Sequence, residues 1–157
     1  MIEPRTRPQT HFEATTLATP EAISDLTDKV MAFLDEHGVE NRATHHTALV
    51  LSEVLTNLCT HGDCRDRPAR IAVDVGPDEV RAEIVDRGPP FDPTLAPEPS
   101  LDVAAGDRPI GGLGLYLVRK LSCKLEYARR NEENCTRFAI SRTASGLAAG
   151  SGANARE

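Results

Sequence analysis

Residues 111–118 read Gly-Gly-Leu-Gly-Leu-Tyr-Leu-Val, and apolar residues continue at helical spacing through Val118 and Leu121. Glycine-rich backbone at the start of a helix presents unpaired N–H groups and the positive end of the helix dipole, which together can hold phosphate oxygens. The segment is not a Walker loop, because Gly112 stands where that loop requires lysine. Taken alone, it fits a flexible hinge as well as a phosphate site.

Upstream, a helix is predicted from about Arg42 to His61, and it carries a pair of polar residues. Glu53 and Asn57 are four residues apart, which places them on one face of the helix. A carboxamide is a neutral oxygen ligand that suits Mg²⁺, and a carboxylate one turn away can accept a proton from an attacking hydroxyl. By itself, such a pair is more often an ordinary polar face. A separate apolar stripe predicts the buried face: Ala48, Leu51, Val54, Leu55 and Leu58.

Between these segments, alternating apolar residues predict two antiparallel strands over 70–75 and 80–85. Asp86 and Gly88 follow the second strand. A carboxylate at a strand end can accept a hydrogen bond from an exocyclic amine such as that of adenine, and glycine lets the backbone approach a flat ring. Asp-x-Gly-Pro is also a common turn, so this pattern has two interpretations.

The rest of the chain completes an α+β domain of about residues 10–142. We expect a two-layer sandwich, in which helices cover one face of a mixed, mostly antiparallel sheet. Residues 1–9 and 143–157 lack periodicity and are expected to be disordered. Further expected elements are a strand over 11–16, a helix over 20–37 that ends before Gly38, a proline-rich lid over 89–109, and strands over 124–129 and 136–141.

Composition narrows the possible partners and location. The formal net charge of -6 disfavours a nucleic-acid binder, and the arginines at 65, 67 and 70 are interpreted as a solvated loop. No apolar run is long enough for a membrane helix, and the N-terminus lacks the apolar core of a signal peptide, so a cytoplasmic location is expected.

Cysteine usage fits that location. The four cysteines are expected to remain reduced thiols in the cytoplasm. Cys59, His61 and Cys64 have a spacing that suggests zinc, but a second ligand pair is missing, so buried thiols are the preferred interpretation.

The order and spacing of the three motifs resemble the N, G1 and G2 boxes of the GHKL superfamily, which is named for gyrase, Hsp90, histidine kinases and MutL. The motifs are Glu-x-x-x-Asn on a helix, Asp-x-Gly-x-x-Phe after a hairpin, and Gly-Gly-x-Gly-Leu at a helix start. The resemblance covers about residues 10–141 and implies the Bergerat fold of histidine-kinase-like ATPases. Residues 52–57 and 111–118 look most like the anti-sigma factor serine/threonine kinases.

This resemblance implies a role for each matching residue. Glu53 would be the general base, and Asn57 the Mg²⁺ ligand. Asp86 would bind the adenine amine, with Thr136 helping through water. The remaining implied nucleotide contacts are Gly88, Phe91, Gly111, Gly112, Gly114 and Leu115. Two positions depart from the family pattern, since Pro90 and Cys135 stand where the family usually has glycine.

The resemblance also implies an activity: transfer of the γ-phosphate of Mg-ATP to a serine or threonine of a STAS-domain anti-anti-sigma factor. The freed kinase would then bind a sigma factor, and such kinases are commonly dimers. A partner histidine as acceptor remains open. The alternative from another class is a non-catalytic adapter that binds ATP or nothing and acts by sequestering its partner.

Overall fold

The structure is a computed structural model that describes residues 10–61, 67–95 and 112–143, except for the side chains of residues 61, 112 and 113. Its strands form one sheet in the order β1-β2-β3-β5-β4. The strands are β1 (His11–Thr16), β2 (Ala69–Val75), β3 (Glu79–Asp86), β4 (Lys124–Arg130) and β5 (Glu133–Ser141). The helices are α1 (Pro20–Glu36), α2 (Asn41–His61), α3 (Gly112–Leu121) and the short 3-10 helix η1 (Pro93–Leu95). None of the helices in these ranges has the length and apolar character needed to cross a membrane.

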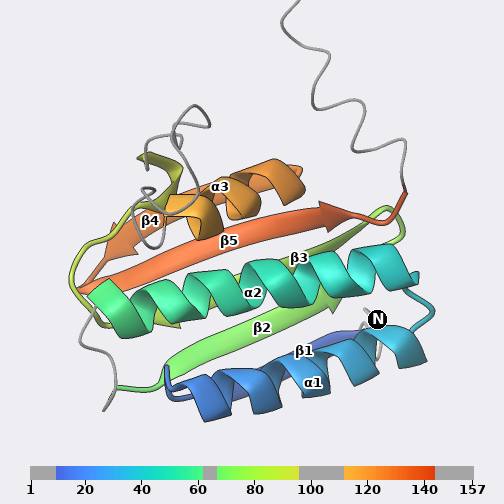
Figure 1. The fold of residues 1–157 in the computed structure, drawn as a ribbon, viewed down its shortest axis with the longest axis horizontal. Coiled ribbons are helices and arrows are strands. Elements are labelled where there is room, and N and C mark those ends of the chain that lie inside the picture. The colour runs from blue at the N-terminus through green and yellow to red at the C-terminus, as the bar shows by residue number, and fades with distance from the viewer. Residues whose placement is uncertain (1–9, 62–66, 96–111, 144–157) are drawn as a thin grey trace, which may run out of the picture.

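All three α-helices lie on one face of the sheet, and no described helix covers the other, which we call the uncovered face (Figure 1). The predicted two-layer α+β sandwich is therefore confirmed. The sheet was expected to be mixed, but all four described pairings are antiparallel. The pairs β2–β3 and β4–β5 are hairpins, and their strands are therefore antiparallel. The elements that connect β1 to β2 and β3 to β5 also return the chain in the opposite direction.

Local sequence sets the ends of α1. The Thr19 hydroxyl oxygen accepts a hydrogen bond from the Ala22 N–H at 3.3 Å, and Pro20 begins the helix with its φ already helical. After the last helical residue, Gly38 adopts φ of 74°, a left-handed conformation that glycine takes without steric cost. The predicted helix over 20–37 is thus confirmed to within one residue.

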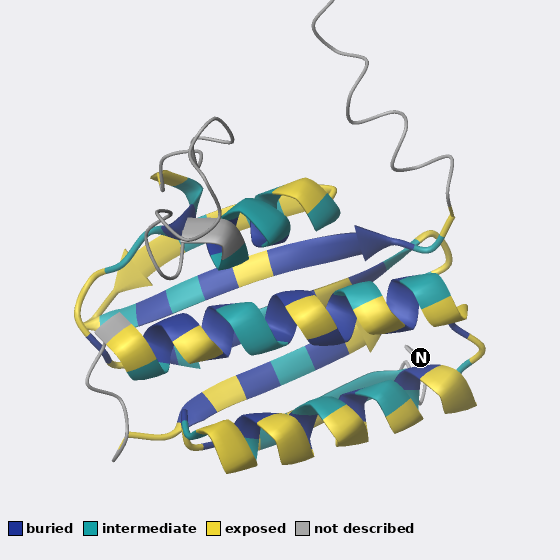
Figure 2. Cartoon of the chain, viewed as in Figure 1, coloured by how far each residue is buried: buried dark blue, intermediate teal, exposed yellow. Residues whose placement is uncertain are grey.

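The core lies between this helix layer and the sheet. Every apolar residue predicted for the buried stripe of α2 is buried. Buried and more exposed residues alternate along most of β2 and over residues 133–138 of β5, where one strand face meets the helices, and the rest of β5 is buried (Figure 2). This packing fixes the rotation of α2 about its axis, and hence the direction of its polar residues.

The register of β3 and β5 positions the predicted site. Asp86 pairs with Asn134, and Ile84 pairs with Thr136, on the face that the helices cover. β5 begins at Glu133, three residues before the predicted start. Most of the predicted lid lies outside the described residues.

Candidate functional site

The N-terminal turn of α3 packs against α2 at Glu53. A methyl group at Gly114 would overlap the Glu53 carboxylate, so the absence of a side chain there makes the contact possible. Two segments separated by about sixty residues are therefore brought together, as the motif pattern predicted. Gly112 is the first residue of α3, whereas Gly111 lies outside the described residues.

A narrow pocket lies next to this contact. It collects half of the predicted site residues from four elements and the segment after β3. Its lining is Val54, Asn57, Leu58, Asp86, Phe91, Pro93, Leu115 and Thr136. Its cavity volume is about 10 Å³, which is room for about one water. In this conformation the pocket is too small for an adenine ring.

Asn57 presents an unsatisfied polar group at this pocket. The residue is only 8% exposed, and its amide nitrogen Nδ2 has no hydrogen-bond partner within the described residues. A buried polar group without a partner is costly, so such a group indicates a missing ligand or water. Flipping the carboxamide by 180° exchanges its NH₂ donor and its oxygen acceptor, so this group suits both a nucleotide and a hard cation. The donor and acceptor atoms of Asn57 therefore suit a magnesium nucleotide.

The Asp86 carboxylate is held in place by two donors. Its Oδ1 accepts hydrogen bonds from the Gly88 N–H at 2.8 Å and from Asn134 Nδ2 at 3.0 Å. Within the described residues, Oδ2 has no such partner. Asp86 is 4% exposed and lines the pocket, so this second oxygen is available to a ligand donor. The turn interpretation and the ligand interpretation of Asp86 are thus compatible.

Asn134 is a candidate site residue that the sequence analysis missed. Besides Asp86, its Nδ2 contacts the carbonyl oxygens of Gly88 at 3.2 Å and Pro89 at 3.0 Å. Its Oδ1 accepts hydrogen bonds from the Tyr127 hydroxyl and from Arg129 Nη1 at 2.8 Å. Asparagine can satisfy this set because it has donors and acceptors on one side chain. The available signal was a polar residue at an inward position of a strand.

Cys135 does not obstruct the pocket despite its departure from the family pattern. Successive residues of a strand point to opposite faces, so Thr136 lines the pocket while Cys135 lies on the uncovered face beside Arg137. Partial burial raises the pKa of the Cys135 thiol above its ordinary value. Pro90 is exposed and does not line the pocket.

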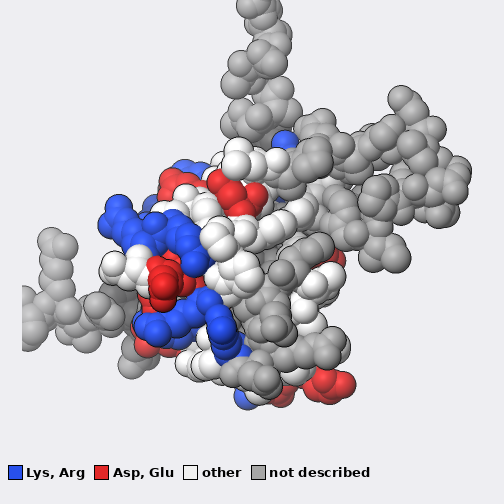
Figure 3. Space-filling model, turned by 90° about the vertical axis from the view of Figure 1, so that its left-hand side faces the viewer, with Lys and Arg blue, Asp and Glu red and all other residues white. Residues whose placement is uncertain are grey.

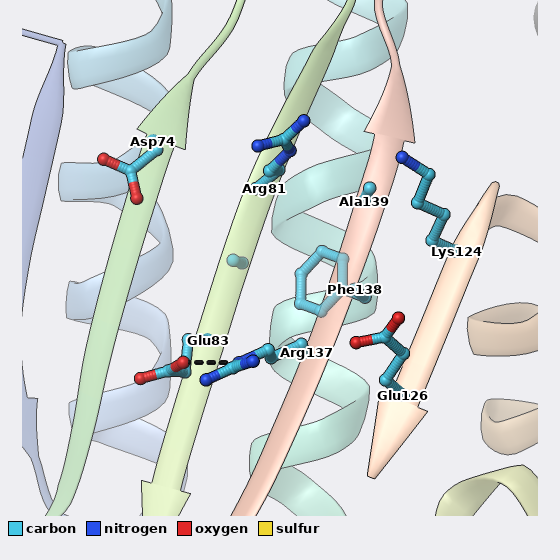
Figure 4. A pocket seen from close by; sticks show the side chains of 9 residues that line it. Asp74, Arg81, Glu83, Lys124, Glu126, Arg137, Phe138 and Ala139 are labelled. Carbon is cyan, nitrogen blue, oxygen red and sulfur yellow. Dashed lines mark hydrogen bonds and ion pairs between the residues drawn. The ribbon is translucent and has the colours of Figure 1, made fainter.

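The uncovered face carries a separate depression of about 230 Å³ (Figure 4). Within its lining, Arg137 Nε donates to Glu83 Oε2 at 2.6 Å, whereas Lys124 Nζ donates at 3.2 Å to Glu79 Oε1, which lies outside the lining. It contains none of the predicted site residues. Its size alone therefore does not make it a nucleotide site.

The described cysteines and histidines do not form a metal site. In the described ranges no three His, Cys, Asp or Glu side chains are grouped for a metal. Cys64 and the His61 side chain lie outside those ranges. Cys59, Cys123 and Cys135 are free thiols.

The model of the histidine kinase-like ATPase domain matches residues 16–140. The chain belongs to this family. The GHKL resemblance is thereby confirmed, and the match covers nearly all of the described ATPase domain.

One similar protein is named a serine/threonine kinase, and one solved structure shares the fold. The serine/threonine-protein kinase BtrW of Bordetella bronchiseptica is 35% identical over 88 residues, which cover 55% of this chain and 62% of BtrW. The match thus spans less than two thirds of that relative. The crystal structure of the RsbU and RsbW domains of Rv1364c from Mycobacterium tuberculosis has a TM-score of 0.59 at 19% identity, covering 85% of this chain and 33% of that one. This second likeness concerns the fold.

Proposed function

We propose that this histidine kinase-like ATPase domain is a serine/threonine protein kinase of the anti-sigma type. It transfers the γ-phosphate of Mg-ATP to a hydroxyl of a STAS-domain anti-anti-sigma factor, and it binds a sigma factor when that partner is released. The similarity to BtrW, itself named a serine/threonine kinase, supports the choice of acceptor.

The observation that carries the proposal is the packing of the Glu53 carboxylate against Gly114. The carboxylate is one turn from Asn57 and beside the glycine-rich start of α3, and this proximity supports its role as the base that acts at the terminal phosphate. A pure adapter has no need for this carboxylate. We therefore prefer the kinase over the adapter.

In the proposed reaction the acceptor hydroxyl gives its proton to the Glu53 carboxylate as its oxygen bonds to the γ-phosphorus. The bond from that phosphorus to the β,γ-bridging oxygen breaks, and ADP leaves with the bond's electron pair. Backbone N–H groups at the start of α3 would hold phosphate oxygens. Asn57 would bind Mg²⁺, which offsets phosphate charge. Asp86 would accept a hydrogen bond from the adenine amine.

The direct test incubates the purified protein with γ-labelled ATP and a set of STAS-domain proteins, and then locates the label. We expect label on a serine or threonine of one STAS protein. With Glu53→Gln, ATP affinity should be retained while transfer slows by roughly 10²- to 10⁴-fold, the range for loss of a general base.

Ser52→Ala serves as the matched control on the same helix, because the Ser52 hydroxyl donates only to the Leu49 carbonyl oxygen. Normal transfer by Glu53→Gln would remove Glu53 from the mechanism. Nucleotide binding without any labelled partner would favour the adapter.

A further inference from the structure

Five arginines gather at the end of the sheet where β2 begins and where β3 and β4 end. We call this set the arginine surface: Arg67, Arg70, Arg87, Arg129 and Arg130. Figure 3 views the molecule from this end, and Lys and Arg side chains surround a small acidic group on the visible face. In the sequence, Arg67 lies near Arg70, and Arg129 lies next to Arg130. The fold brings these two pairs and Arg87 together from distant segments.

One carboxylate organises the centre of this surface. Glu133 accepts hydrogen bonds from Arg70 Nη2 at 3.2 Å and from Arg87 Nε at 3.3 Å. The Glu133 side chain is 29% exposed, whereas those of Arg70 and Arg87 are 64% and 73% exposed. A mostly covered anion therefore holds two outward-facing guanidinium groups, which keep most of their N–H donors for another ligand.

Two of the other arginines use neutral acceptors. Arg67 Nη1 donates to the Arg87 carbonyl oxygen at 2.9 Å, and Arg129 Nη1 donates to the Gly88 carbonyl oxygen at 3.0 Å. These bonds fix the side chains without cancelling their charge. Arg130 has no hydrogen bond or ion pair with any described residue.

The surface thus carries an excess of positive charge on a chain whose net charge is -6. Glu132 and Glu133 lie at the turn between β4 and β5 beside these arginines. Glu83 and Glu126 line a depression together with Arg70 and Arg130. Glu83 is paired with Arg137, so five arginines still outnumber the acidic side chains left to them. Charges separated by more than about 8 Å are largely screened at physiological salt, so a local excess acts on a ligand bound within that range.

We infer that the arginine surface binds an acidic segment of a protein partner. Carboxylates match the forked guanidinium donors in geometry and charge. A nucleic acid fits less well, because its charge extends beyond the surface and would meet the negative remainder of the chain. The surface adjoins the Asp86 turn through Arg87 and Arg129, yet Arg70 and Arg130 do not line the nucleotide pocket. The inference therefore stands apart from the proposed kinase activity.

The test measures binding of fluorescein-labelled hexaglutamate by anisotropy at low ionic strength, without nucleotide. The variant is Arg70→Gln with Arg130→Gln. The matched control is Lys29→Gln with Arg81→Gln, which removes the same charge from exposed positions of α1 and β3 that lie outside the arginine surface, 63% and 71% exposed. We expect the variant to bind about tenfold more weakly and the control to bind within about twofold of the parent.

A thymidine hexanucleotide of similar charge is titrated in parallel and should bind more weakly than the peptide. Absence of peptide binding to the parent would overturn the inference, as would equal losses in both double variants or tighter binding of the oligonucleotide. Circular dichroism and ATP affinity, which we expect to be unchanged in both variants, show that the fold and the nucleotide site are intact.

Discussion

At the scale of single residues, Gly114 allows a test that separates activity from stability. The group that an added methyl would strike is the end of the flexible Glu53 side chain, which can turn away at little cost. Gly114→Ala should therefore leave the free energy of unfolding unchanged, or raise it by up to about 1 kcal/mol through better helix propensity. We expect phosphate transfer to fall by roughly 10²-fold or more, because the base is displaced.

Lys120→Ala, at an exposed position of the same helix, is the control. Urea unfolding and label transfer are measured on both variants. Full transfer by Gly114→Ala would mean that the carboxylate position beside α3 does not matter for the reaction.

Asn134 supports a second prediction at this scale. Asn134→Ala leaves Asp86 Oδ1 and the carbonyl oxygens of Gly88 and Pro89 without their amide donor. The variant should lose about 1–3 kcal/mol of unfolding free energy and bind ATP more weakly, because the Asp86 carboxylate is no longer oriented. Urea unfolding and calorimetric titration with ATP measure the two effects.

Tyr127→Phe provides a graded comparison. It removes one donor to Asn134 Oδ1 while Arg129 still donates, so the loss of stability should be only about 0.5–1.5 kcal/mol. If Asn134→Ala matched the parent in both measurements, the side chain would have no positioning role.

At the scale of elements, the attachment of β1 to β2 should depend on pH. The His11 imidazole lies between Glu13 Oε1 at 2.7 Å and Asp74 Oδ1 at 2.5 Å, and these hydrogen bonds, that of Glu13 first, raise the pKa of His11. Arg81 of β3 lies opposite Asp74 in the strand register, and its guanidinium group stays charged over the whole pH range of the test. A raised pKa in the folded state means that protonation stabilises the fold.

This contribution is fully present below about pH 6.5, the ordinary histidine pKa, and is lost as the pH rises through the higher pKa of the folded state. Because the Glu13 and Asp74 side chains are largely exposed, we expect this contribution to the free energy of unfolding to be at most about 1 kcal/mol. Urea unfolding between pH 5.5 and pH 9, roughly spanning that titration, should show the loss in the parent and not in His11→Gln. An equal pH dependence in both proteins would contradict the prediction.

The elements also show why one boundary was misjudged. Alternating apolar residues located β2 and β3 closely, since one face of each strand is buried. The start of β5 was placed three residues late because Asn134 is polar although it points inward. Its burial depends on Asp86 and Tyr127 from neighbouring strands, and no local pattern records such partners.

At the scale of the whole molecule, nucleotide binding should stabilise the fold. Mg-ATP at about 100 times its dissociation constant adds about 2.7 kcal/mol, which raises Tm by roughly 5–10 °C for a domain of this size. Mg-GTP should give a much smaller shift, because guanine offers Asp86 a carbonyl where adenine offers an amine. Thermal unfolding of the parent and of Asp86→Asn measures the shift in Tm with each nucleotide. Equal shifts for Mg-ATP and Mg-GTP in the parent would reject the adenine assignment.

By itself, the sequence determined the three motifs, the periodicities of the helices and strands, and the layered α+β class, because these follow from spacing along the chain. Only the tertiary structure decided that Gly114 lies against Glu53, that Asn134 orients Asp86, and that five arginines share one surface. Such contacts depend on the order and register of strands in the sheet. That order is fixed by packing between segments far apart in the chain, which local residue patterns do not encode.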